Sequence, residues 1–364
     1  WAYSVQQTSD GGYIVAGYTL SFGAGSWDIF LLKTDASGNL QWAKTFGGSS
    51  VEMTFSVQQT SDGGYIVAGI TNSFGAGDWD VFLLKTNASG NLQWAKTFGG
   101  SSYDEARSVQ QTSDGGYIVA VYTGSFGAGS GDVFLLKTDA SGNLQWAKTF
   151  GGSNNEIALS VQQTSDGGYI VAGYTESFGA GYTDIFLLKI NASGNLQWAK
   201  TFGGSSYDRA YSVQQTSDGG YIVAGETSSF GAGNYDVFLL KTDASGNLQW
   251  ARTFGGSNGD YAYSVRQTSD GGYIVAGYTL SFGAGSRDAF LLKINASGNL
   301  QWAKTFGGSS YDEARSVRQT SDGGYIVAGR TGSFGAGYSD VFLLKTNANG
   351  NIGTCAIVGS PTPT

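Results

Sequence analysis

Histidine is absent from this chain of 364 residues, which also has one cysteine, two prolines and one methionine. Without histidine, the chain cannot form a Ser-His-Asp or Cys-His catalytic site or a histidine-ligated metal centre. A single cysteine, Cys355, excludes an intrachain disulfide and a metal centre built from several thiolates. No apolar run approaches the roughly 20 residues of a membrane-spanning helix.

Positive charge is also scarce, because 20 Lys and Arg residues face 28 Asp and Glu residues, for a net charge of −8. The chain has no basic stripe, which argues against nucleic acid as a partner. Carboxylates and carbonyls are the ligands that calcium prefers. We therefore expect no cofactor, with calcium as the one open possibility.

What the sequence does have is a repeat of 52 residues, present seven times without insertion or deletion. The segment SVQQTSDGGYIVAG begins at Ser4 and returns with small changes at Ser56, Ser108, Ser160, Ser212, Ser264 and Ser316. A repeat of this period indicates one structural unit per copy rather than two or three unrelated domains.

Each copy predicts four β-strands and no helix. In the first copy the strands are expected at 4–8, 13–19, 29–33 and 40–46, separated by Ser-Asp-Gly-Gly, a glycine-rich loop and Asp-Ala-Ser-Gly-Asn. We call them strands a to d. Strands b and c are apolar on both faces, as expected for sheets covered on both sides by neighbours, whereas strand d is more polar and suits an exposed edge.

These features predict an all-β fold, a seven-bladed β-propeller with four antiparallel strands in each blade. The competing fold is a linear β-solenoid, which needs altered capping repeats that the terminal copies do not show. We expect a single propeller over 1–358, followed at 359–364 by the start of a Pro/Thr linker to further protein. The expected blades are 1–48, 49–100, 101–152, 153–204, 205–256, 257–308 and 309–358.

The blade layout is similar to that of kelch repeats, where a Tyr-rich strand, here YIVAG, precedes an Asp-led strand, DIFLL, and an outer strand with Trp, LQWAKTF. The double glycine of kelch repeats after the second strand is absent. The whole unit resembles the SVQQTSDGGYIVAGYT repeats of secreted and surface proteins of bacteria and archaea. That resemblance implies an extracellular or cell-surface propeller and offers no defined activity. The chain starts at Trp1, so any signal peptide lies outside this sequence.

Differences between the copies gather in two places, the b–c loop with the end of strand b before it, and the link from strand d to the next strand a. In a four-stranded meander both places lie on the same face of the disc. Aromatic and arginine side chains anchor many interfaces, so this face is the predicted binding face, with drift after duplication as the alternative. The binding candidates are Trp27, Trp79, Tyr182, Glu226, Tyr235, Arg287, Arg330 and Tyr338.

Acidic residues recur at fixed positions. The d–a link is acidic in all six copies that show it, and these residues are weak metal candidates: Glu52, Asp104, Glu156, Asp208, Asp260 and Asp312. The preferred interpretation is structural, as caps of backbone N–H groups or partners of Arg107 and Arg315. Asp10, Asp28 and Lys33 recur in all seven copies. They are interpreted as turn-forming and strand-opening residues and as a blade-to-blade ion pair or an exposed lysine, with calcium bound once per blade by the Asp10 or Asp28 set as the weaker alternative.

Three c–d turns open an Asn-Ala-Ser sequon, at Asn87, Asn191 and Asn295. These are glycosylation candidates on the surface, although Asn and Asp also replace each other as turn formers. Cys355, in the altered last strand d, is expected to be a small buried residue.

Three functions follow as hypotheses. The first is a non-enzymatic extracellular propeller that binds a glycan or a surface protein on the varied face. The second is a structural repeat of a surface layer, stalk or filament, in which copies contact each other. The third, and weakest, is a carboxylate-based glycosidase using Glu226 with Asp208 or Asp260; no catalytic residue is assigned, because most acidic residues recur in every copy.

Overall fold

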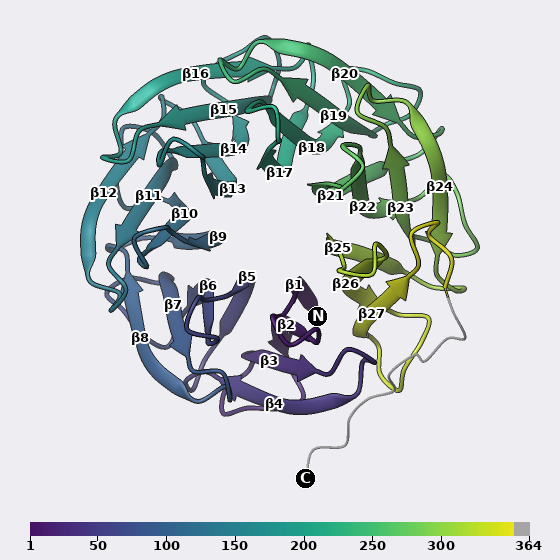
Figure 1. The fold of residues 1–364 in the computed structure, drawn as a ribbon. Helices are drawn as coiled ribbons and strands as arrows, with labels where there is room; N and C mark the ends of the chain where they lie inside the picture. The colour runs from purple at the N-terminus through teal and green to yellow at the C-terminus, as the bar shows by residue number, and fades with distance from the viewer. Residues whose placement is uncertain (353–364) are drawn as a thin grey trace.

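The computed structural model describes residues 1–352 and confirms a ring of seven small antiparallel sheets, with no helix in that part of the chain. Each sheet is one blade, and its strands run outward from the axis in the order a, b, c, d (Figure 1). Six blades show four strands and the seventh shows three, β25, β26 and β27. The expected last strand d, Cys355 and the expected 359–364 linker lie outside the described residues.

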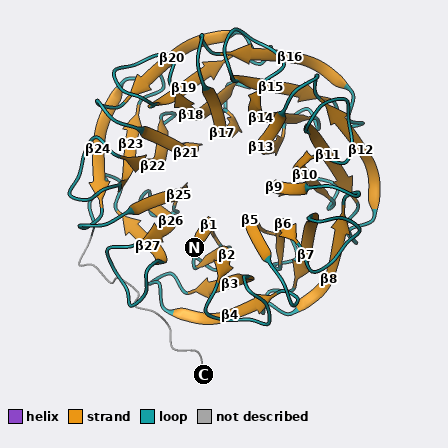
Figure 2. Cartoon of the chain, turned by 180° about the vertical axis from the view of Figure 1, so that it is seen from behind, coloured by secondary structure: helices purple, strands orange, loops and turns teal. Residues whose placement is uncertain are grey.

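Seen from behind, the same ring has the a strands innermost and the d strands around the rim (Figure 2). The a strands are β1 (Ala2–Gln7), β5 (Glu52–Gln59), β9 (Asp104–Gln111), β13 (Glu156–Gln163), β17 (Asp208–Gln215), β21 (Asp260–Gln267) and β25 (Asp312–Gln319). The b strands are β2 (Tyr13–Thr19), β6 (Tyr65–Thr71), β10 (Tyr117–Thr123), β14 (Tyr169–Thr175), β18 (Tyr221–Thr227), β22 (Tyr273–Thr279) and β26 (Tyr325–Thr331).

The two outer sets complete the blades. The c strands are β3 (Asp28–Thr34), β7 (Asp80–Thr86), β11 (Asp132–Thr138), β15 (Asp184–Ile190), β19 (Asp236–Thr242), β23 (Asp288–Ile294) and β27 (Asp340–Thr346). The d strands are β4 (Leu40–Phe46), β8 (Leu92–Phe98), β12 (Leu144–Phe150), β16 (Leu196–Phe202), β20 (Leu248–Phe254) and β24 (Leu300–Phe306).

The core lies between blades, which explains why the middle strands are apolar on both faces. In one cluster, Ile66 and Leu83 of the second blade pack against Tyr117 and Val119 of the third. The same arrangement recurs around the ring, and Val5 and Tyr13 of the first blade pack against Ile326 of the seventh. Each blade therefore depends on its neighbours for burial of its apolar faces.

Blade-to-blade hydrogen bonds close the ring without an exchange of strands among the described residues. The serine of each strand a accepts a hydrogen bond from the backbone N–H of the valine in the next blade, as in Val57 N to Ser4 Oγ at 3.2 Å. At the closure, Val5 N donates to Ser316 Oγ at 3.4 Å and Ser321 N donates to Gln7 Oε1 at 3.0 Å. The serine-to-valine hydrogen bond of the other junctions thus also joins the seventh blade to the first.

The inner strands begin earlier than the sequence pattern indicated. Strand a of the second copy starts at Glu52, because Glu52 pairs with Thr71 and Met53 with Ile70 at the end of strand b. A register shift between Thr54 and Ser56 accommodates one extra residue there. The residues interpreted as a linker are therefore the first residues of the inner strand.

Candidate functional site: the varied face and the axial channel

The two segments that differ between copies are joined directly. Trp27 of the first b–c loop forms a parallel bridge with Val51 of the following d–a link, and Glu52 N donates to Trp27 O at 2.8 Å. The same bridge recurs five more times around the ring. We call this side the varied face and the side with the a–b and c–d turns the uniform face. Substitutions in one varied segment therefore change the surroundings of the other.

The aromatic candidates mostly stack on neighbours from strand b or the d–a link. Trp27 stacks on Tyr18 with ring centroids 5.0 Å apart, and Tyr235 stacks on Tyr261 at 5.5 Å. Trp79 lies against Tyr103, at 6.3 Å. These rings are half-buried, so each offers one side to solvent while the other side is covered.

Two tyrosines project further from this face. Tyr182 keeps 68% of its surface exposed although it stacks on Tyr207 at 5.3 Å, and Tyr338 is fully exposed. The hydroxyl of Tyr311 donates to the backbone oxygen of Tyr338, which orders that loop. Exposed rings on ordered loops suit contact with a ligand, because little conformational entropy is lost on binding.

Arg287 and Arg330 converge on one carboxylate that the sequence analysis did not single out, Glu313. Glu313 is fully buried and forms ion pairs with Arg287 at 2.8 Å, Arg330 at 2.6 Å and Arg315 at 2.6 Å. Burial raises the pKa of Glu313, but the three guanidinium groups outweigh burial and hold the pKa below its ordinary value. Three guanidinium groups thus share a single carboxylate on this side of the ring.

Glu226 has a different environment. It is buried on β18 and pairs with Arg209 at 3.3 Å. Burial raises its pKa more than Arg209 and the Tyr211 hydroxyl lower it. Successive residues of a strand point to opposite faces, and Asp208 pairs with Thr227, the residue after Glu226. Glu226 and Asp208, one of the two pairs considered for a glycosidase, therefore point to opposite sides of their sheet.

The six recurrent acids of the d–a link are buried caps. Glu52 accepts hydrogen bonds from Gly48 N at 2.6 Å, Thr71 Oγ1 at 2.7 Å and Ser73 N at 3.2 Å. Asp208 likewise accepts from Gly204 N and Ser229 Oγ. No group of three or more acidic or cysteine residues suited to a metal ion occurs within residues 1–352.

The sequence interpretation in which Arg107 and Arg315 pair with these acids is wrong. The two arginines pair with Glu105 and Glu313, each of which follows a recurrent acid by one residue on the same strand. Asp28 bonds within its own b–c loop. Its carboxylate is buried and accepts a hydrogen bond from Gly25 N at 2.9 Å. This bond folds the glycine-rich loop back onto the start of strand c.

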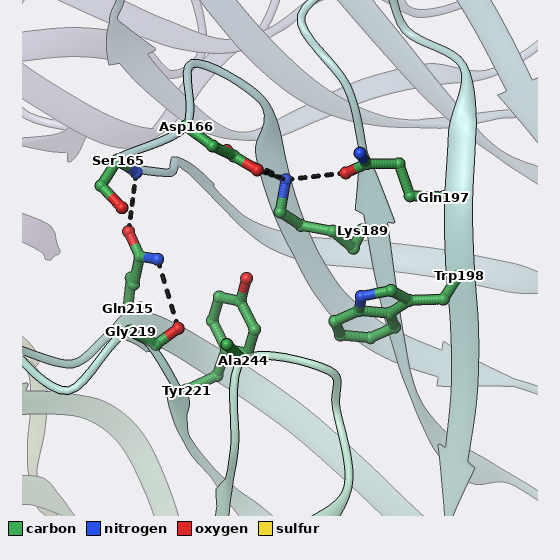
Figure 3. Close-up of a pocket in the computed structure, with 9 residues that line it drawn as sticks. All are labelled: Ser165, Asp166, Lys189, Gln197, Trp198, Gln215, Gly219, Tyr221 and Ala244. Carbon is green, nitrogen blue, oxygen red and sulfur yellow. Dashed lines mark hydrogen bonds and ion pairs between the residues drawn. The ribbon is translucent and has the colours of Figure 1, made fainter.

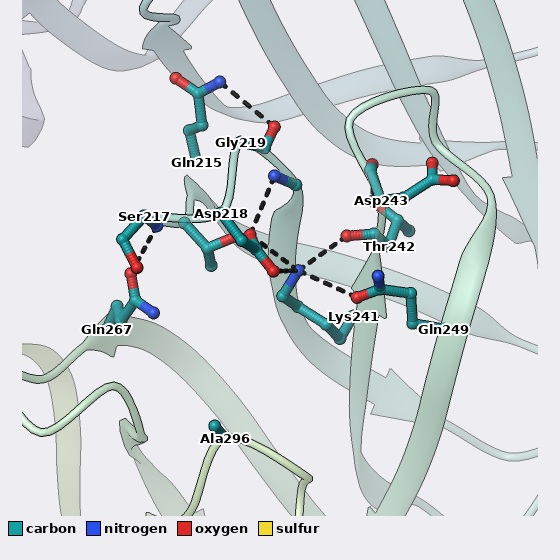
Figure 4. Close-up of polar contacts among 12 residues, drawn as sticks. Gln215, Ser217, Asp218, Gly219, Lys241, Thr242, Asp243, Gln249, Gln267 and Ala296 are labelled. Carbon is teal, nitrogen blue, oxygen red and sulfur yellow. Dashed lines mark hydrogen bonds and ion pairs between the residues drawn. The ribbon is translucent and has the colours of Figure 1, made fainter.

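The constant lysine forms an ion pair within its own blade, so the prediction of an exposed lysine or a blade-to-blade pair is wrong. Lys241 is buried on β19 and its ammonium group lies 2.9 Å from Asp218, in the a–b turn of the same sheet (Figure 4). It also donates to Thr242 O at 2.8 Å and Gln249 Oε1 at 3.2 Å. The lysine thus ties together strands b to d at the uniform face.

A groove opens between neighbouring blades on the uniform face. The one between the fourth and fifth blades encloses about 370 Å³ (Figure 3). Its lining residues are Ser165, Asp166, Lys189, Gln197, Trp198, Gln215, Gly219, Tyr221 and Ala244. Trp198 and Tyr221 meet edge to face at 5.9 Å, and the equivalent pair recurs at five other junctions, so the uniform face repeats the same chemistry.

The main feature that sequence reasoning missed is the axial channel, a cavity of about 460 Å³ lined by the a strands. The residue just before the constant serine differs between copies and lines this channel toward the varied face: Tyr3, Phe55, Arg107, Leu159, Tyr211, Tyr263 and Arg315. The sequence did carry a signal for this lining, because the residue before the constant serine differs from copy to copy. Side chains at this position contact their equivalents in the adjacent blade: the guanidinium of Arg107 lies 4.5 Å from the centre of the Phe55 ring, and that of Arg315 lies 4.1 Å from the centre of the Tyr263 ring.

The sequons occupy the c–d turns of the uniform face. Asn87 Oδ1 accepts hydrogen bonds from Ser89 N at 3.0 Å and Asn91 N at 2.9 Å. Asp35 accepts the equivalent bonds from Ser37 N and Asn39 N in the first blade. Asn and Asp therefore form the same turn, and glycosylation at Asn87, Asn191 and Asn295 stays a prediction.

Comparisons with known proteins agree with this architecture. The family model described as "Domain of unknown function (DUF5122) beta-propeller" matches residues 164–196 and 268–300. The chain is a propeller repeat protein. Both matches cover equivalent parts of the fourth and sixth copies, from the a–b turn to the first residue of strand d.

One relative is Regulatory protein FlaEY of Caulobacter vibrioides, which is 28% identical over an alignment of 174 residues that covers 41% of this chain and 18% of the relative. The chain thus matches about a fifth of the length of that protein. Among solved structures, Sqt1 from Chaetomium thermophilum has a TM-score of 0.52 over 90% of this chain and 79% of its own. A puromycin hydrolase mutant complexed with PGG has a TM-score of 0.58, and the match covers 98% of this chain and 54% of the hydrolase chain. Both are 11% identical, so they are similar in fold alone.

Proposed function

We propose that this propeller is a non-enzymatic binding module that takes a glycan or a protein on its varied face. The observation that carries the proposal is that the differences between the seven copies gather on one face of the ring. The uniform face repeats one set of turns, ion pairs and Trp–Tyr contacts, whereas exposed Tyr182 and Tyr338 and the arginines around Glu313 all lie on the other face. Aromatic and arginine side chains are the residues that contribute most to binding energy.

The geometry also supports a binding role over a catalytic one. Glu226 is paired with Arg209 and points away from Asp208, and Asp208 is itself a buried cap that accepts hydrogen bonds from Gly204 N and Ser229 Oγ. A glycosidase needs two carboxylates that face one substrate. Testing Glu226→Gln for loss of any glycosidase activity remains the direct check of that alternative.

The test of binding uses two variants of the intact chain. Tyr182→Ala with Tyr338→Ala removes the two most exposed rings of the varied face, and Leu196→Ala removes a half-exposed apolar side chain from the outer strand β16 as the control. Labelled protein is applied to glycan and peptide arrays. We expect the tyrosine variant to lose at least tenfold in affinity and the leucine variant to bind as the parent does. Binding that survives in the tyrosine variant contradicts the proposal.

An extracellular or cell-surface location is part of the proposal and is supported by the resemblance of the repeat. Labelling of intact source cells with a membrane-impermeant amine reagent tests it, because exposed lysines of the outer strands, such as Lys44 and Lys96, react only if the protein is outside.

The second candidate, a structural repeat, is favoured by one observation. Each outer strand exposes a leucine to the same degree, with between 41% and 54% of its surface in solvent: Leu40, Leu92, Leu144, Leu196, Leu248 and Leu300. A regular ring of apolar side chains suits contacts between copies. Light scattering of the native protein across a concentration series distinguishes the two, since the structural role requires self-association.

A further inference from the structure

We propose that the axial channel holds a binding site for a small inorganic oxyanion, such as phosphate or sulfate, between Arg266 and Arg318. Both side chains line the channel, on the neighbouring strands β21 and β25. They lie three residues further along their strands than Tyr263 and Arg315, toward the uniform face. The site is separate from the varied face and does not depend on the function proposed for it.

The two arginines interrupt a repeated belt of hydrogen bonds. In five blades this position is glutamine, and its side-chain oxygen accepts a hydrogen bond from the next blade, as in Gln59 N to Gln6 Oε1 at 2.7 Å and Gln267 N to Gln214 Oε1 at 2.7 Å. A guanidinium group has no acceptor, so Arg266 and Arg318 cannot form this bond. At two adjacent blade junctions, a positive charge therefore replaces the glutamine that accepts this hydrogen bond.

Neither arginine has an anionic partner among the described residues. Arg266 donates to Val265 O at 3.1 Å, and the Nε atoms of both arginines are buried without a hydrogen-bond partner. By contrast, the five arginines nearer the varied face each have a carboxylate within 3.3 Å: Arg107, Arg209, Arg287, Arg315 and Arg330. Arg252, which also lacks one, lies on the exposed outer strand β20.

The channel wall carries no compensating negative charge. Among the described residues, the lining consists of tyrosine, phenylalanine, leucine, valine, serine, glutamine and arginine, with no aspartate or glutamate. This is unexpected in a chain of net charge −8. A positive, low-dielectric cavity concentrates anions from solution.

Burial makes the uncompensated charges unfavourable. Burial lowers the pKa of Arg318 to about 10, and burial together with repulsion from Arg318 lowers the pKa of Arg266. Arginine side chains stay charged in proteins, so an anion between the two would offset their repulsion. Guanidinium groups bind oxyanions through paired N–H···O bonds, and nearby serine hydroxyls such as Ser264 and Ser316 line the same cavity.

The experiment measures binding of inorganic phosphate and sulfate by isothermal titration calorimetry in low-salt buffer at pH 7.5. The test variant is Arg266→Gln with Arg318→Gln, which restores the residue of the other five blades. The control is Arg252→Gln, the same chemical change on the outer strand. We expect one site per parent molecule, retained in the control and weakened at least tenfold in the double variant.

Thermal unfolding provides a second readout. At phosphate tenfold above its dissociation constant, the melting temperature of the parent should rise by about 2 °C more than that of the double variant. General salting effects act on both proteins equally. If the double variant does not fold, the two single variants replace it. No binding to the parent at 10 mM anion, or equal binding by parent and double variant, overturns the proposal.

Discussion

The ammonium group of Lys241 lies 2.9 Å from the carboxylate of Asp218, and this contact recurs in every blade between residues 23 apart in sequence. In six of the blades the lysine side chain is at most 6% exposed, while the aspartate is more than half exposed. The pair therefore joins a buried charge to a solvated one at the uniform face.

The first prediction concerns acid stability. Burial raises the pKa of Asp218, but hydrogen bonds from Thr216 and Lys241 outweigh burial and lower it from 3.8 to about 2. A carboxyl whose pKa is lower in the folded state contributes stability above its unfolded pKa and loses it as pH falls through the folded value. All seven equivalents have a pKa of about 2. Stability should thus fall steeply between pH 4 and pH 2, measured by urea unfolding, and a flat profile there contradicts the assignment.

The second prediction isolates one copy of this contact. Asp218→Asn removes the charge opposite buried Lys241 and should lower the free energy of unfolding by about 1 to 2 kcal/mol, because hydrogen bonds to charged groups are worth that order and the exposed carboxylate is screened. Asp243→Asn is the matched control, since other copies carry Asn at that turn position, and should change stability by less than about 0.5 kcal/mol. Equal effects in denaturant titrations would contradict it.

The third prediction concerns the turn after strand d. A Cβ at Gly255 would lie 1.9 Å from Asp236 Oδ1 and 2.8 Å from Asp260 Oδ2, two buried carboxylates. Gly255→Ala should therefore destabilise the fold by about 3 kcal/mol through overpacking. At Gly271 nothing lies within 4 Å, and only the positive φ of 80° opposes alanine. Gly271→Ala should cost about 1 kcal/mol, so thermal melts should rank the two variants clearly.

The fourth prediction compares two buried glutamates. Glu313→Gln leaves three arginines without their counter-charge and should cost about 3 kcal/mol. Glu226→Gln should cost about 1 kcal/mol or less, because burial already favours the neutral form of Glu226, as its raised pKa shows. Chemical denaturation of the two variants tests the order, and a larger loss for Glu226→Gln would contradict the described electrostatics.

The fold could be predicted because the repeat is present in the sequence itself. A period of 52 residues, strands with both faces apolar and constant turn residues specify sheets that must be covered by neighbours. The varied face also followed, since a four-stranded meander places the b–c and d–a connections on one side. These conclusions need only local patterns and the geometry of strands.

The chemistry of the site depended on contacts between copies. The sequence does not indicate that Arg287 and Arg330 meet Arg315 at Glu313, because Arg330 comes from the adjacent strand β26 and Arg287 from the preceding blade. The side of a strand on which Glu226 lies depended on the register with β17.

Periodicity alone gives the number of blades, the order of their strands and the face that varies. The folded chain was needed to show that Lys241 is buried, that the recurrent acids cap backbone N–H groups instead of pairing with Arg107 and Arg315, and that Arg266 and Arg318 line one axial channel. The lysine and the acids depend on strand register within a blade, and the two arginines depend on the closure of the ring, and neither register nor closure can be read from a pattern of residues.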